Sequence, residues 1–151
     1  YCPAPFTLLS GLMIDWIDDN VAIGNWMDAR NVKMLQREGI DLVLDSRVLF
    51  DDSKGRSRRT PKVDLIEREV RFILALAGMG AKVLIRCYHG RDRSPFVAMV
   101  YISRKLGISH LQAYEMVKER RRMTVPHWDW VDMLEKNGEG VSTDDVLSGS
   151  D

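Results

Sequence analysis

Short apolar runs alternate along this chain with longer stretches in which apolar residues recur at helical spacing. The runs at residues 40–44 and 83–85 each follow a helical stretch that ends at glycine, over residues 28–38 and 63–78 respectively. Strands that alternate with helices in this way form a parallel sheet covered by helices. The pattern predicts an α/β fold in a single domain, with a central, mostly parallel, twisted sheet of about four to five strands flanked by helices on both faces.

The remaining segments complete this prediction. Turn-forming residues at 18–20 separate two short strands over 13–17 and 21–24, which predicts a hairpin, and the run 40–44 is apolar enough to lie inside the sheet. Residues 51–61 lack apolar periodicity and read as an exposed loop. Three more helices are predicted, over residues 95–106, 109–121 and 126–137. The domain is therefore expected to span residues 1–137, with a packed arm at its start and a disordered tail over 138–151.

Composition excludes several classes of protein. Basic and acidic residues both number 22 among 151, so overall charge indicates no polyanionic partner. The only two cysteines, Cys2 and Cys87, cannot form a disulfide framework, which favours a reducing compartment, and the cytoplasm is expected. No stretch reaches the roughly 18 apolar residues of a membrane span, so none is predicted.

The residues that indicate chemistry lie between the apolar run 83–85 and Pro95, where a strand, a tight loop and a helix start follow one another. Backbone N–H groups and the dipole of the helix can hold a phosphate there. The same field lowers the pKa of a thiol, which makes Cys87 the candidate nucleophile. Arg93 lies across the loop, where its planar guanidinium can bind two phosphate oxygens in the transition state.

The rest of this loop supports a two-step phosphoryl transfer. Gly90 permits a turn that a side chain would obstruct, and the Ser94 hydroxyl can lie beside the sulfur and help it to leave. The chemistry needs no metal and no cofactor. The predicted phosphate-binding residues are Tyr88, His89, Gly90, Arg91, Asp92 and Arg93.

The spacing of Cys87, five residues, Arg93 and Ser94 resembles the Cys-x5-Arg-Ser/Thr signature of the protein tyrosine phosphatase superfamily. Residues 17–25, 39–44 and 94–122 resemble the flanking elements of small dual-specificity phosphatases, so the likeness covers roughly residues 16–135. It implies a cysteine-dependent phosphatase that hydrolyses phosphotyrosine, phosphoserine or phosphothreonine through a phosphocysteine. Its partner would be a phosphorylated protein or a small phosphorylated molecule.

The resemblance also implies an aspartic acid, upstream of the cysteine, that serves as general acid. Phe50-Asp51-Asp52 is similar to a Phe-Asp-Asp segment of some small members, which makes Asp52 the first candidate, with Asp51 or Asp64 as replacements. The alternative is a plain surface acid. Asp92 is a second candidate, because myotubularins and Sac-type lipid phosphatases carry an acid in this place. Otherwise Asp92 forms an ion pair with Arg86 or Arg91.

Two features leave alternatives open. Arg86 stands where the family usually has histidine, and it either lowers the thiol pKa by its charge or points away into an ion pair. His89-Gly90 resembles the loop of RNA 5′-triphosphatases, and Arg91 with the basic residues 54–59 would suit substrates that carry several phosphates. The alternative function is therefore a phosphatase of phosphoinositides, nucleotides or RNA 5′-triphosphate ends. Only the RNA substrate would give this chain a nucleic-acid partner. A second alternative is a catalytically silent phosphate-binding module.

Overall fold

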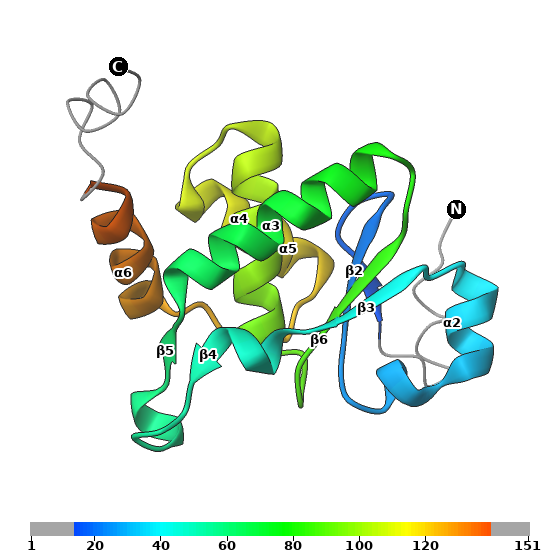
Figure 1. The fold of residues 1–151 in the computed structure, drawn as a ribbon, viewed down its shortest axis with the longest axis horizontal. Helices are drawn as coiled ribbons and strands as arrows, with labels where there is room; N and C mark the ends of the chain where they lie inside the picture. The colour runs from blue at the N-terminus through cyan, green and yellow to red at the C-terminus, as the bar shows by residue number, and fades with distance from the viewer. Residues whose placement is uncertain (1–13, 140–151) are drawn as a thin grey trace.

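The central sheet has the strand order β1-β2-β6-β3 (Figure 1). The computed structural model describes residues 14–139. Strand β1 (Asp15–Trp16) pairs antiparallel with β2 (Val21–Gly24), which confirms the predicted hairpin. The other two pairings, of β6 (Val83–Arg86) with β2 and with β3 (Leu42–Asp45), are parallel. The predicted α/β sheet is thus confirmed.

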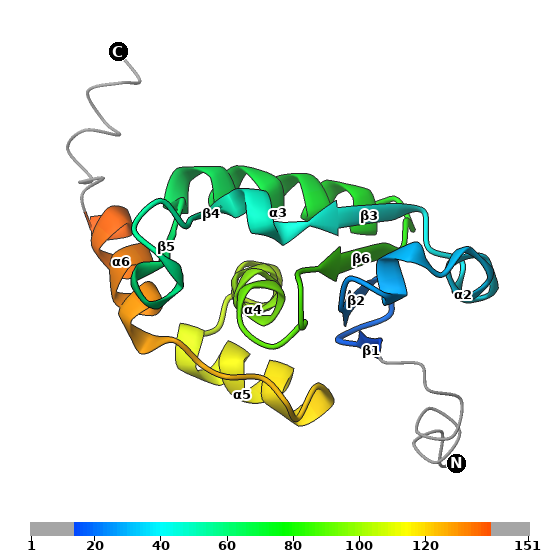
Figure 2. The ribbon, with the colours of Figure 1, turned by 90° about the horizontal axis from the view of Figure 1, so that it is seen from below.

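Alternation along the strands divides the core between the two faces of the sheet. Val21, Ile23 and Ile85 belong to the larger hydrophobic cluster, whereas Ala22 and Leu84 belong to a smaller one. The larger cluster lies under helices α3 (Val63–Gly78), α4 (Arg93–Leu106), α5 (His110–Arg120) and α6 (Trp128–Glu139). The 3-10 helix η1 (Asp28–Arg30) and helix α2 (Val32–Glu38) lie on the opposite side (Figure 2).

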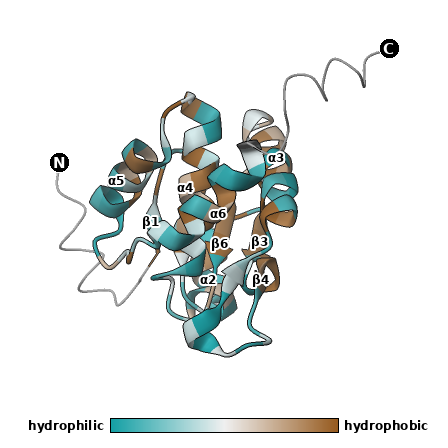
Figure 3. Cartoon of the chain, turned by 90° about the vertical axis from the view of Figure 1, so that its left-hand side faces the viewer, coloured by the Kyte–Doolittle hydropathy of each residue, from teal (hydrophilic) through white to brown (hydrophobic). Residues whose placement is uncertain are grey.

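Helix α4 is the centre of the molecule and carries the end of the predicted active-site loop. Its residues from Arg93 to Ser103 are all buried. A helix surrounded on all sides needs apolar residues all round, and the sequence from Pro95 to Ile102 supplies them. Figure 3 shows these hydrophobic residues beside β6. Since α4 begins where β6 has just ended, the loop between them is held at both ends by the core.

Three local predictions were wrong. Strand β3 lies at the edge of the sheet, since it pairs with β6 alone and its side chains are only half-buried. The predicted helix over 28–38 is split at Asn31. The side chain of Asn31 accepts a hydrogen bond from Met34 N (3.1 Å), so Asn31 caps the start of α2. The exposed loop over 51–61 contains strands β4 (Phe50–Asp51) and β5 (Thr60–Pro61), which pair antiparallel around the 3-10 helix η3 (Arg56–Arg58).

The predicted ends of the domain lie largely outside the described residues. Helix α6 continues to Glu139, so the tail does not begin at residue 138. The rest of that tail, like Cys2 and the arm at the start, lies outside the described residues. Over the part that the structure describes, no helix combines the length and the apolar character needed to cross a membrane.

Candidate active site

Residues 87–92 form the loop between β6 and α4. Gly90 has φ +66°, and a Cβ atom at this position would lie 2.6 Å from the carbonyl oxygen of Gly24, so only glycine fits. The carbonyl of Gly90 accepts a hydrogen bond from Arg121 Nε (2.5 Å). The loop backbone is therefore fixed against strand β2 on one side and the end of α5 on the other.

The thiol of Cys87 lies at the bottom of this loop and is 2% exposed. Its Sγ accepts a hydrogen bond from Gly90 N (3.2 Å). Burial raises the pKa of Cys87, but hydrogen bonds from the hydroxyl and N–H of Ser94 and from Gly90, with the charge of Arg93, outweigh burial, so the pKa lies below its ordinary value. A larger fraction of this sulfur is therefore thiolate than in a free cysteine at the same pH.

A second serine, which the sequence did not single out, lies behind Ser94. Ser46, from the 3-10 helix η2 (Ser46–Leu49), is fully buried. Its hydroxyl donates to the carbonyl of Arg86 (2.8 Å), and its Oγ is 3.1 Å from the Oγ of Ser94. The Ser46 side chain thus connects the end of β6 to the start of α4.

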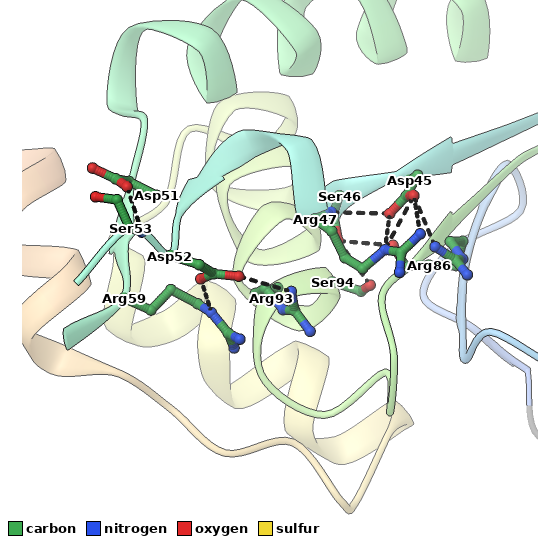
Figure 4. Close-up of polar contacts among 10 residues, drawn as sticks. All are labelled: Asp45, Ser46, Arg47, Asp51, Asp52, Ser53, Arg59, Arg86, Arg93 and Ser94. Carbon is green, nitrogen blue, oxygen red and sulfur yellow. Dashed lines mark hydrogen bonds and ion pairs between the residues drawn. The ribbon is translucent and has the colours of Figure 1, made fainter. Parts of the chain in front are cut away.

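Arg93 and Asp52 face each other across the site. Arg93 is buried, and its Nη1 lies 3.9 Å from Oδ2 of Asp52. The other carboxylate oxygen of Asp52, Oδ1, accepts a hydrogen bond from Arg59 Nε (Figure 4). Asp51 turns the other way and accepts from Ser53 N (2.9 Å). Asp64, on α3, instead bonds the side chain of Asn137 (3.2 Å). Of the three upstream candidates, the structure brings only Asp52 next to Arg93.

The Asp92 side chain contacts the segment before α6. Its Oδ1 is 2.8 Å from Nε2 of His127, and its Oδ2 is 3.8 Å from Nε of Arg91. The hydrogen bond to His127 is the main reason that the pKa of Asp92 is lowered, although burial opposes it. An ion pair with Arg91 was one of the alternatives considered for Asp92, whereas the shorter contact with His127 was not expected from the sequence. No ion pair between Asp92 and Arg86 is present among the described residues.

Arg86 points into an ion pair. Its Nη1 lies 2.8 Å from Oδ2 of Asp45, and Arg47 bonds the same carboxylate (2.7 Å). Burial opposes ionisation of Asp45, but hydrogen bonds from Arg47 and Arg86 lower its pKa to about 2. The second of the two interpretations, in which Arg86 points into an ion pair, agrees with this geometry.

An open pocket of about 420 Å³ lies above the loop. Its lining consists of five charged side chains, one aromatic and one aliphatic: Asp45, Arg47, Asp52, Arg56, Arg93, Tyr88 and Val48. Tyr88 is half-exposed, stacks on Trp26 with ring centroids 6.0 Å apart, and meets His89 edge-on at 4.6 Å. Among residues 14–139 no cluster of side chains could hold a metal ion. The pocket is suited to an anion with a side chain or ring attached.

A larger groove of about 850 Å³ lies elsewhere, between α3, α4, α5 and α6. Two ion pairs lie in its lining: Arg104 bonds Glu67, and His110 Nδ1 lies 3.0 Å from Glu135 Oε1. It has no nucleophile in its lining, so it is separate from the chemistry of Cys87.

Two residues that support the site, Arg121 and Ser46, were not predicted from the sequence, and neither was the contact of a third, His127, with Asp92. The side chain of Arg121 is buried and reaches Gly90, Ile23 and Asp15. Ser46 and His127 lie far from the loop in sequence. For Arg121 and Ser46 no signal was available. For His127 the acid at position 92 was a signal, because a carboxylate in an anion-binding loop needs a partner.

Comparisons with known proteins agree with this geometry. Residues 20–138 match the family model of the dual specificity phosphatase, catalytic domain. Among curated proteins, the chain is 29% identical over 135 residues to the dual specificity protein phosphatase MPK-4 of Drosophila melanogaster, covering 80% of this chain and 35% of that protein. It is 23% identical over 131 residues to the protein-tyrosine-phosphatase IBR5 of Arabidopsis thaliana, covering 83% and 51%. The chain thus spans about a third to a half of these relatives.

Solved structures show the same fold. The crystal structure of human DUSP28 matches with a TM-score of 0.70 at 23% identity, over 85% of this chain and 95% of that one. At this identity the likeness concerns the fold alone.

Proposed function

The chain belongs to the family of dual specificity phosphatase catalytic domains, and on that premise we propose that it hydrolyses phosphotyrosine and phosphoserine or phosphothreonine through a phosphocysteine on Cys87. The observation that carries this proposal is the lowered pKa of a thiol that is hydrogen-bonded by Gly90 and Ser94 at the start of α4. Such a thiolate is poised to attack phosphorus.

In the first step, the sulfur of Cys87 forms a bond to phosphorus while the bond from phosphorus to the leaving oxygen breaks. The backbone N–H groups of the loop and the guanidinium of Arg93 bind the other phosphate oxygens as charge develops on them. Asp52, which lies beside Arg93, gives its proton to the leaving oxygen. The dephosphorylated hydroxyl product then departs.

In the second step, water attacks the phosphorus and the bond to sulfur breaks. Asp52, now ionised, takes a proton from the water. The Ser94 hydroxyl donates to the departing thiolate, which it already contacts in this structure. The products are inorganic phosphate and the original thiolate, so no metal or cofactor enters either step.

Removal of the sulfur nucleophile tests this proposal. We expect wild-type protein to hydrolyse p-nitrophenyl phosphate and a phosphotyrosine peptide, with inhibition by vanadate, and Cys87→Ser to lose at least about a thousandfold in kcat, because the alcohol is a far weaker nucleophile. Absence of vanadate-sensitive turnover in wild type would leave the silent phosphate-binding module as the explanation.

Substrate class is tested in the same assay. Family membership favours a protein substrate over the phosphoinositide, nucleotide and RNA alternatives. Turnover of the phosphotyrosine peptide should therefore exceed that of an inositol polyphosphate and of a triphosphate-ended RNA. Faster hydrolysis of either of the latter would overturn the assignment.

The reactive thiol and the family match also bear on the cellular compartment and on the extent of the domain. A nucleophilic thiol needs a reducing environment, which supports the cytoplasm. The family match over residues 20–138 supports a single catalytic domain, for which the predicted range is 1–137.

A further inference from the structure

Asp92 places a negative charge inside a loop that binds an anion. It comes directly before Arg93, and its lowered pKa keeps it ionised at neutral pH. A carboxylate that turned toward the pocket would repel a phosphate dianion and would compete with it for Arg93. The loop can therefore work only if this side chain is held outward.

The side chain that meets Asp92 is His127. Nε2 of His127 lies 2.8 Å from Oδ1 of Asp92, and both side chains are about one quarter exposed (28% each). Because an ionised carboxylate only accepts hydrogen bonds, Nε2 must be the donor. The other contact of Asp92, with Arg91, is longer at 3.8 Å, and the Arg91 side chain is 51% exposed. His127 is thus the stronger restraint on the direction of Asp92.

His127 is itself fixed by its surroundings. Its ring stacks on Trp130 with centroids 3.7 Å apart and planes at 12°. Its backbone N–H donates to the hydroxyl of Tyr114 (3.3 Å), and its Nδ1 lies 3.9 Å from Asp129. Trp130 is 3% exposed, and its Nε1 donates to the carbonyl of Arg59 (3.0 Å). The position of the imidazole beside the loop is therefore fixed by its packing against the buried ring of Trp130 in α6.

We propose that His127 is a positioning residue for the phosphate site, which holds the Asp92 carboxylate turned away from the bound anion. The inference rests on the proposed function, because it concerns the same loop. It assigns to His127 a role in the affinity for phosphate, without contact between His127 and the substrate.

Binding of inorganic tungstate, a phosphate-like oxyanion, measures this role without any turnover. In isothermal titration calorimetry, His127→Ala should weaken tungstate binding about tenfold, since the freed carboxylate can approach the anion. His127→Gln, whose amide N–H can occupy the place of Nε2, should remain within about threefold of wild type. In turnover of p-nitrophenyl phosphate, His127→Ala should raise KM more than it lowers kcat.

A double variant separates positioning from mere support of the fold. Asp92→Asn combined with His127→Ala should bind tungstate more tightly than His127→Ala alone, because the charge that needed restraint is gone. A purely structural role would leave the double variant as weak as the single one, or weaker, and would overturn the proposal. Unchanged binding in His127→Ala would overturn it as well.

Two further measurements complete the test. His110→Ala removes a comparable histidine–carboxylate pair, with Glu135, in the separate groove, and should leave tungstate binding at the wild-type value. If His127→Ala does not fold, the tungstate affinity of Asp92→Asn alone is the test. An affinity lower than that of wild type would show that the Asp92 carboxylate does not repel the anion. Tungstate binding that follows these expectations without catalytic turnover would uphold the role of His127 while rejecting the proposed hydrolysis.

Discussion

Around Cys87, single side chains from remote parts of the sequence hold a loop of only six residues. Ser46 reaches the carbonyl of Arg86, Arg121 reaches that of Gly90, and His127 reaches the carboxylate of Asp92. The loop itself could be predicted, because a strand, a cysteine, a glycine and an arginine follow each other at fixed spacing. Ser46 and Arg121 could not, because a hydrogen bond across tens of residues leaves no local pattern. For His127 the one signal was the acid at position 92, which needs a partner.

The ion pair of Arg86 with Asp45 yields a prediction about stability. The pKa of Asp45 is about 2 in the folded protein, against an ordinary value of 3.8. A lowered carboxyl pKa contributes stability above the ordinary value and loses it as pH falls from about 4 to about 2, here about 1 kcal/mol after allowance for solvent screening. Asp45→Asn should therefore unfold at lower urea concentration than wild type at pH 6, and the gap should narrow at pH 2.5.

The matched control for this measurement is Asp19→Asn, an exposed acid in the turn after β1. Its urea midpoint should follow that of wild type at both pH values. A gap between Asp45→Asn and wild type that stays constant from pH 6 to pH 2.5 would show that the ion pair has no part in the difference.

At the scale of elements, hydrophobic periodicity predicted those parts that the core surrounds. Helix α3, strand β6 and helix α4 bury continuous stripes or runs, so their patterns were clear in the sequence. The hairpin of β4 and β5 has strands of two residues each and few buried side chains, so no period could reveal it. The edge position of β3 was equally hidden, because a short apolar run does not say how many neighbours a strand has.

Asp52 follows directly after β4 in this hairpin, and its position predicts the effect of its removal. Asp52→Asn should lower kcat for phenyl phosphate about a hundredfold, the usual range for a lost general acid. The loss should be smaller for p-nitrophenyl phosphate, because nitrophenolate is a stable leaving group without protonation. Steady-state kinetics with both substrates would measure the two losses.

Asp51→Asn is the control for that experiment, since Asp51 is adjacent but turned toward Ser53. Its kcat should stay within about threefold of wild type for both substrates. Equal losses in Asp52→Asn for the two substrates would indicate that the carboxylate only positions Arg93 and does not protonate the leaving group.

Across the whole molecule, Arg121 connects the end of α5 to the loop and to the first two strands. Its guanidinium is buried and bonds Asp15 (2.8 Å), Gly90 and Ile23. Burial raises the pKa of Asp15, while Arg121 opposes that rise. A buried charge with partners on three segments couples the integrity of the sheet to the geometry of the site.

Arg121→Met tests this coupling. The change should lower the free energy of unfolding by about 3 kcal/mol, because Asp15 loses its cation and the carbonyls of Gly90 and Ile23 lose this donor. Arg120→Met, at an exposed neighbouring position, should cost less than about 0.5 kcal/mol. Guanidinium chloride unfolding at pH 7 would compare the two, and equal midpoints would contradict a structural role for Arg121.

The close approach of Gly90 to Gly24 also limits which amino-acid substitutions this chain can accept during evolution. A methyl group at position 90 would collide with the main chain of the central sheet, whereas the half-exposed ring of Tyr88 has solvent beside it. Related chains can therefore differ at exposed pocket residues such as Tyr88 and bind different substrates. A variant with another residue at position 90 would instead fail to form this loop, so it would be lost whatever substrate it met.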